Sequence, residues 1–176
     1  MTATVISLVA FKGGVAKTSS TAMISYNLAK RNYKVIMVDL DPQANLTAIS
    51  LRTKLAQLGE NANTVIDSSL MKAVQDDDLS EAQINIMPNL DLIGSSMDFS
   101  LYPEYMLNRS QSMKEQVKYL DELLKPIIKD YDFCIIDTPP TLSLYLSSAL
   151  YASDFALCLL KTDPFSIEGL EHLLKY

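Results

Sequence analysis

The chain has 176 residues, of which 48% are hydrophobic and only 5 are glycine and 7 proline. This length and composition suit one domain with a hydrophobic core, and they exclude a chain made mainly of flexible linker. The net charge of −6 excludes a surface that is basic as a whole, so any contact with nucleic acid requires a local basic patch.

The first predicted element is a strand that leads into a glycine loop. Residues 5–10 form an apolar run of strand length, which predicts a buried parallel strand. In the loop, Gly13 and Gly14 allow the backbone to curl with its N–H groups pointing inward, and a helix follows. Such a loop binds phosphate, with Lys17 reaching the outer phosphates and the Thr18 hydroxyl ligating Mg²⁺. The alternative is a simple glycine turn between a core strand and a helix.

Next come a helix over residues 18–31 and a buried strand over residues 35–40. The packing face of the helix is expected to consist of Ala22, Met23, Tyr26, Leu28 and Ala29. Asp39 and Asp41 stand at the C-terminal end of this strand, which is the edge where ligands bind in an open α/β sheet. These two acids either form the turn after the strand or face the Mg²⁺–phosphate site. Because a phosphate loop lies one crossover upstream, we favour the site.

The centre of the chain carries no recognisable chemistry. Its patterns predict helices over residues 44–57, 64–75 and 97–107 and short strands over residues 84–87 and 90–93. Partner specificity is expected to lie in this region.

A helix after Ser112 precedes another strand with a polar end. Ser112 and Glu115 have the spacing of a capping box, and Pro126 is expected to kink this helix or end it early. The strand over residues 131–137 ends in Asp137, a Walker B pattern in which the carboxylate holds Mg²⁺ through water. Taken alone this signal is weak, because many strands end in aspartate.

The nearly uncharged stretch at residues 142–160 has about the length of a membrane span. Asp154 and several serines interrupt it, so we predict a buried helix, a short turn and a buried strand. Cys134 and Cys158 lie in apolar strands and suit neither a zinc site nor a disulfide framework. The first apolar run becomes a glycine loop rather than a cleavage site, so no signal peptide is predicted and a cytoplasmic protein is expected.

Alternating strands and helices predict an α/β fold with a doubly wound, mostly parallel sheet and flanking helices. Three motifs resemble those of the ParA/MinD family of ATPases. Residues 12–18 fit K-G-G-x-[G/A]-K-[T/S], the deviant Walker A motif, with Ala16 where the general Walker A pattern has glycine. Residues 39–45 are close to the D-x-D-P-Q-G-N of the ParA branch, with Ala44 in place of its glycine, and residues 137–140 (D-T-P-P) are also ParA-like.

The resemblance implies a P-loop ATPase domain over residues 1–176 that binds ATP and Mg²⁺. In the family, the first lysine of the loop, Lys12 here, reaches across a dimer interface to the partner's nucleotide. The resemblance also assigns support of the metal shell to Asp39, and orientation or deprotonation of the attacking water to Asp41. The implied nucleotide-binding residues are Lys12, Gly13, Gly14, Val15, Ala16, Lys17, Thr18 and Ser19. The implied metal residues are Thr18, Asp39 and Asp137, and the implied catalytic residues are Lys12, Lys17 and Asp41.

The function implied by the resemblance is partition of plasmids or chromosomes. In the ATP state a homodimer binds DNA non-specifically, and a ParB-like centromere-binding partner stimulates hydrolysis. No membrane partner is expected. The expected location is the cytoplasm, with association with the nucleoid. A membrane-positioning ATPase of the MinD kind is an alternative, as is a truncated protein-interaction module without hydrolysis. Relatives continue past residue 176, so the chain is expected to lack about the C-terminal third of a typical relative.

Overall fold

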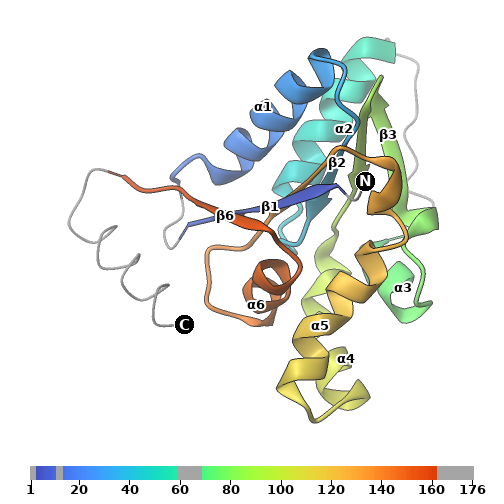
Figure 1. Cartoon of the computed structure of the whole chain (residues 1–176), viewed down its shortest axis with the longest axis vertical. Coiled ribbons are helices and arrows are strands. Elements are labelled where there is room, and N and C mark those ends of the chain that lie inside the picture. Colours follow the sequence, from blue (N-terminus) through green and yellow to red (C-terminus); the bar gives the residue numbers. More distant parts are fainter. Residues whose placement is uncertain (1–2, 11–13, 59–68, 162–176) are drawn as a thin grey trace.

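The computed structural model describes residues 3–10, 14–58 and 69–161. Within them, six strands form one mixed sheet in the order β3-β4-β2-β5-β1-β6 (Figure 1). The strands are β1 (Thr4–Val9), β2 (Val35–Asp39), β3 (Gln83–Met87), β4 (Leu90–Ile93), β5 (Phe133–Asp137) and β6 (Phe155–Cys158). Neighbouring strands pair in parallel except β3 and β4, which form an antiparallel pair at one side of the sheet. The predicted α/β fold with a mostly parallel sheet is confirmed.

Helices cover both faces of this sheet (Figure 1). They are α1 (Lys17–Lys30), α2 (Asn45–Leu58), α3 (Leu70–Gln75), α4 (Tyr102–Arg109), α5 (Met113–Leu124) and α6 (Leu144–Tyr151). Short 3-10 helices occupy Ser80–Ala82, Met97–Leu101 and Ile128–Asp130. The core has two parts, because alternate residues of each central strand face opposite sides. Val35 and Met37 pack with α1 and α2, whereas Ile36 and Val38 pack with the helices that follow.

The most deeply buried positions along α1 carry small side chains, two of them polar. Thr21, Ser25 and Ala29 are buried at a spacing of one helical turn, whereas Met23 is 61% exposed. Placing Met23 on the packing face was therefore wrong. Small side chains allow α1 to approach the sheet closely, and the Thr21 hydroxyl reaches Asp137 at 3.2 Å.

The boundaries of α5 agree with the prediction, although its cap does not. The helix begins after Ser112 and ends at Leu124, before Pro126 as expected. The Ser112 side chain makes no capping hydrogen bond in the described structure, so the capping box was wrong. The Glu115 carboxylate instead accepts a hydrogen bond from the Ser110 hydroxyl at 2.5 Å.

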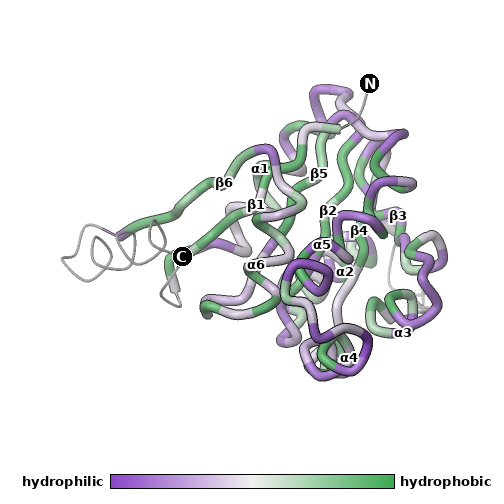
Figure 2. The backbone as a smooth tube through the Cα atoms, turned by 60° about the horizontal axis from the view of Figure 1, so that its bottom comes forward, coloured by the Kyte–Doolittle hydropathy of each residue, from purple (hydrophilic) through white to green (hydrophobic). Residues whose placement is uncertain are grey.

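The stretch at residues 142–160 forms α6 and β6, as predicted, but the strand is not buried. Phe155 and Leu157 are 64% and 44% exposed, because β6 is an edge strand whose described partner is β1 alone. Figure 2 shows β6 as a hydrophobic strand that extends away from the body of the sheet. Among the residues that the structure describes, no helix is long and apolar enough to cross a membrane.

Candidate functional site

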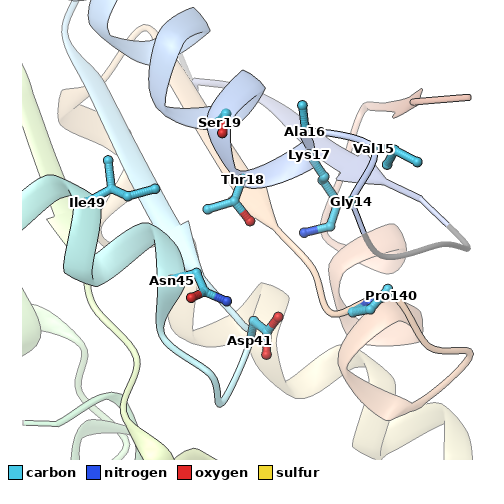
Figure 3. Close-up of a pocket in the computed structure, with 10 residues that line it drawn as sticks. All are labelled: Gly14, Val15, Ala16, Lys17, Thr18, Ser19, Asp41, Asn45, Ile49 and Pro140. Carbon is cyan, nitrogen blue, oxygen red and sulfur yellow. The ribbon is translucent and has the colours of Figure 1, made fainter. Parts of the chain in front are cut away.

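A cavity of about 350 Å³ opens at the carboxyl ends of the central strands (Figure 3). It lies between the loop that enters α1, the turn from β2 into α2, and the segment that leaves β5. Its lining residues are Gly14, Val15, Ala16, Lys17, Thr18, Ser19, Asp41, Asn45, Ile49 and Pro140. This is the sheet edge at which open α/β folds bind ligands.

The N-terminus of α1 faces the cavity and is suited to an anion. The helix begins at Lys17, no described side chain caps it, and its first turn carries no acidic residue. The first N–H groups of a helix lack partners within the helix, and together with the helix dipole they attract phosphate. A phosphate group therefore fits the wall formed by residues 14–19.

Asp137 joins the two side chains that the loop motif singled out. Its Oδ1 lies 2.6 Å from the Lys17 Nζ, and its Oδ2 accepts a hydrogen bond of 2.7 Å from the Thr18 hydroxyl. Lys17 is 7% exposed and Asp137 is fully buried, so this ion pair is shielded from water. The hydroxyl and carboxylate oxygens of Thr18 and Asp137 are the donor type that Mg²⁺ prefers, so this pair fits the metal.

Asp41 lies on the wall opposite Lys17 and Thr18 (Figure 3). It is 9% exposed, and its Oδ1 accepts a hydrogen bond of 2.9 Å from the backbone N–H of Gln43. This bond closes a tight turn, after which α2 begins at Asn45. The carboxylate is therefore held at the cavity by the backbone that follows it.

Asp39, only two residues earlier, does not line the cavity. It is fully buried, and its Oδ2 accepts hydrogen bonds from the backbone N–H and the hydroxyl of Thr47 at 2.9 and 2.8 Å. Its Oδ1 accepts one from the Asp41 backbone N–H at 3.1 Å. Burial, with a smaller contribution from the charge of Asp137, raises the pKa of Asp39 to about 6 against the opposing effect of these hydrogen bonds.

The structure brings most of the predicted residues together. Gly14 to Ser19 and Asp41 line the cavity, and Asp137 contacts two of these residues from beneath. Lys12 and Gly13 lie outside the described residues. No described group of three or more His, Cys, Asp or Glu side chains could hold a metal. A cation here therefore depends on the oxygens of Thr18 and Asp137 and on the ligand's own oxygens.

Three lining residues were missed by the sequence reasoning. Asn45 and Pro140 are the last residues of the motifs at residues 39–45 and 137–140, so these motifs could have indicated both as lining residues. Ile49 lies one helical turn after Asn45 on α2, and only the helical spacing could have indicated it.

Both alanines that replace family glycines have left-handed backbone conformations. Ala16 has φ 61° and Ala44 has φ 54°. For a residue with a Cβ this conformation costs about 1–2 kcal/mol. We therefore expect Ala16→Gly and Ala44→Gly each to raise the free energy of unfolding by about 0.5–1 kcal/mol, after the greater freedom of glycine in the unfolded chain is subtracted. Urea unfolding measures the change.

The matched control for these two variants is Ala22→Gly, inside α1. There glycine should lower the free energy of unfolding by about 1 kcal/mol, since the helix already suits alanine. A loss of similar size from Ala16→Gly would show that residue 16 is not left-handed in solution.

Comparison with known proteins identifies the family of this chain. A family model described as "AAA domain" (AAA_31) matches residues 3–176. The chain is 34% identical over 169 residues to the virulence plasmid ParA family protein pGP5-D of Chlamydia psittaci, a match that covers 94% of this chain and 60% of the relative. A plasmid partition protein from Borrelia burgdorferi B31, solved with bound AMPPNP, has a TM-score of 0.81 and 27% identity. That match covers 99% of this chain and 70% of the other.

A second solved structure is cobyrinic acid a,c-diamide synthase from Mycobacterium smegmatis with bound ADP and magnesium. Its TM-score is 0.80 at 26% identity, over 98% of this chain and 65% of that one. The chain spans 63% and 60% of the length of two curated relatives that it matches. Since the family model covers nearly the whole chain, the protein belongs to the AAA domain family, in its ParA/MinD type.

Proposed function

We propose that this chain is the nucleotide-binding part of a ParA-type partition ATPase that uses ATP and Mg²⁺. The observation that carries the proposal is the junction of Lys17, Thr18 and Asp137 at the uncapped N-terminus of α1, with Asp41 facing it across the cavity. The names of the plasmid relatives and the AMPPNP bound to the Borrelia protein support the same assignment.

Each side chain has one task in this proposal. Lys17 and the first N–H groups of α1 bind the outer phosphates, and Thr18 and Asp137 hold Mg²⁺. When bound, the cation would neutralise part of the negative charge of the phosphates. Asp41 orients the attacking water and accepts its proton, since it is the carboxylate that reaches the cavity from the opposite wall.

The wider cycle follows the family. ATP binding forms a homodimer in which Lys12 contacts the partner's nucleotide, and the dimer binds DNA non-specifically. A ParB-like partner stimulates hydrolysis and so releases the DNA. The net charge of −6 implies that the basic surface for DNA forms locally or only in the dimer. In this proposal the protein acts in the cytoplasm, bound to the nucleoid.

The test is retention of the chain on random-sequence duplex DNA with Mg-ATP and with Mg-ADP, each at low and raised salt. We expect retention with ATP that falls as salt rises, because phosphate contacts release counterions. Equilibrium binding of a fluorescent ATP analogue is measured in parallel. Tight ATP binding with no retention would contradict the DNA-binding part alone, whereas absence of ATP binding would contradict the ATPase assignment and favour a protein-interaction module.

A further inference from the structure

The first turn of α2 is bound to the end of β2 through Asp39. Three donors converge on this carboxylate, namely the N–H and hydroxyl of Thr47 and the N–H of Asp41. Each oxygen of Asp39 accepts at least one of these bonds, and the side chain is fully buried. Asp39 therefore holds the turn that carries Asp41 at one end and Asn45 at the other.

The Thr47 hydroxyl continues this connection to β4. Besides donating to Asp39 at 2.8 Å, it accepts a hydrogen bond of 2.9 Å from the backbone N–H of Ser95, just after β4. Because a carboxylate can only accept and an N–H can only donate, the Thr47 hydroxyl must donate to Asp39 and accept from Ser95. Thr47 is 3% exposed, and a Cβ added at Gly94 would come within 3.0 Å of its methyl group. Thr47 is thus held on two sides with little space to move.

We propose that Asp39 and Thr47 form a positioning bridge between β2, α2 and β4 that holds Asp41 and Asn45 at the cavity. This inference rests on the proposed function and gives Asp39 a different task from ligation of the metal. If Asp39 ligated the metal directly, it would leave the Thr47 and Asp41 donors, which are buried. Leaving buried hydrogen-bond donors unpaired costs free energy. The bridge acts through Asp41, so its loss impairs hydrolysis more than nucleotide binding.

The test is Thr47→Val, which keeps the shape of the side chain and removes the hydroxyl, with Thr47→Ser as the variant that restores it. We expect Thr47→Val to lower kcat by about ten-fold or more while the affinity for ATP changes by less than about three-fold. Thr47→Ser should return kcat to within about three-fold of the unchanged chain. Gly94→Ala should act in the same direction as Thr47→Val, because its Cβ displaces Thr47.

The matched control is Ser50→Ala, one turn further along α2. Its hydroxyl is buried and has no hydrogen-bond partner in the described structure, so its removal should leave kcat unchanged. Hydrogen–deuterium exchange over residues 41–49 gives a readout that does not need hydrolysis. Thr47→Val should speed exchange there, and Ser50→Ala should not.

Two results would overturn the bridge. One is equal loss of kcat and ATP affinity in Thr47→Val, and the other is a Thr47→Val protein with unchanged kcat and unchanged exchange. If the unchanged chain binds ATP but does not hydrolyse it, the proposed ATPase activity fails, and the exchange measurement alone then decides for or against the bridge.

Discussion

Replacing Lys17 with methionine should lower the free energy of unfolding by about 3–5 kcal/mol and abolish binding of ATP. Lys17 pairs at 2.6 Å with Asp137, which is fully buried. Removing the cation leaves a buried carboxylate that, among the described residues, is compensated only by the hydroxyls of Thr18 and Thr21. Urea unfolding measures the stability, and a fluorescent ATP analogue measures the binding.

The double variant Lys17→Met with Asp137→Asn separates the two effects. Since the uncompensated charge is gone, it should recover about half or more of the lost stability, yet it should still not bind ATP. If Lys17→Met alone is as stable as the unchanged chain, the ion pair does not form in solution. If the double variant binds ATP normally, these two residues do not form the phosphate site.

Replacing Asp41 with alanine should leave ATP bound and lower the rate of hydrolysis by about 100-fold or more. Asp41 lines the cavity opposite Lys17 and Thr18, and these two residues keep their bonds to Asp137 without it. Binding therefore survives while the carboxylate that faces the attacking water is lost. Single-turnover hydrolysis and equilibrium binding measure the two properties separately.

Asp41 also closes the turn with Gln43, so a second variant is needed. Asp41→Asn keeps an oxygen that can accept this hydrogen bond but cannot accept a proton. It should be as slow as Asp41→Ala. Near-normal hydrolysis by Asp41→Asn would show that Asp41 acts by shaping the turn, and normal hydrolysis by both variants would remove Asp41 from the mechanism.

The sequence was sufficient for the three central parallel strands and for the start of α1. Continuous apolar runs identify β1, β2 and β5, since parallel strands buried on both faces lack alternation. The glycine loop and the lysine–threonine pair identify the N-terminus of α1 because that chemistry requires fixed spacing. These signals are local, so a single sequence carries them.

Asp39 and Asp41 show where sequence reasoning is insufficient. Both are acids near a strand end, separated by one residue, and an alternating pattern places them on the same side. The strand ends at Asp39, however, and the chain then turns, so Asp41 reaches the cavity while Asp39 meets Thr47 from α2. That contact spans eight residues and depends on how α2 packs, which no local pattern determines.

The exposure of β6 and the buried polar residues of α1 were missed for a related reason. An apolar run does not state whether its strand is central or at an edge, because strand order is a property of the assembled sheet. On α1, hydrophobicity favoured Met23 for the core, but close approach to the sheet selected the small side chains of Thr21 and Ser25, beside the predicted Ala29.

The pairing of β2 with β5 places Asp39 directly opposite Asp137. Successive side chains of a strand point to opposite faces, so one residue inserted within Phe133–Asp137 would turn Asp137 away from Lys17 and also shift it along β2. The turn between β3 and β4 contributes no residue to the cavity lining, and the β3–β4 pairing already carries a register irregularity. A library of single-residue insertions should therefore be depleted within β5 and tolerated at Pro88–Asn89, a pattern of length tolerance that follows the candidate site rather than the surface.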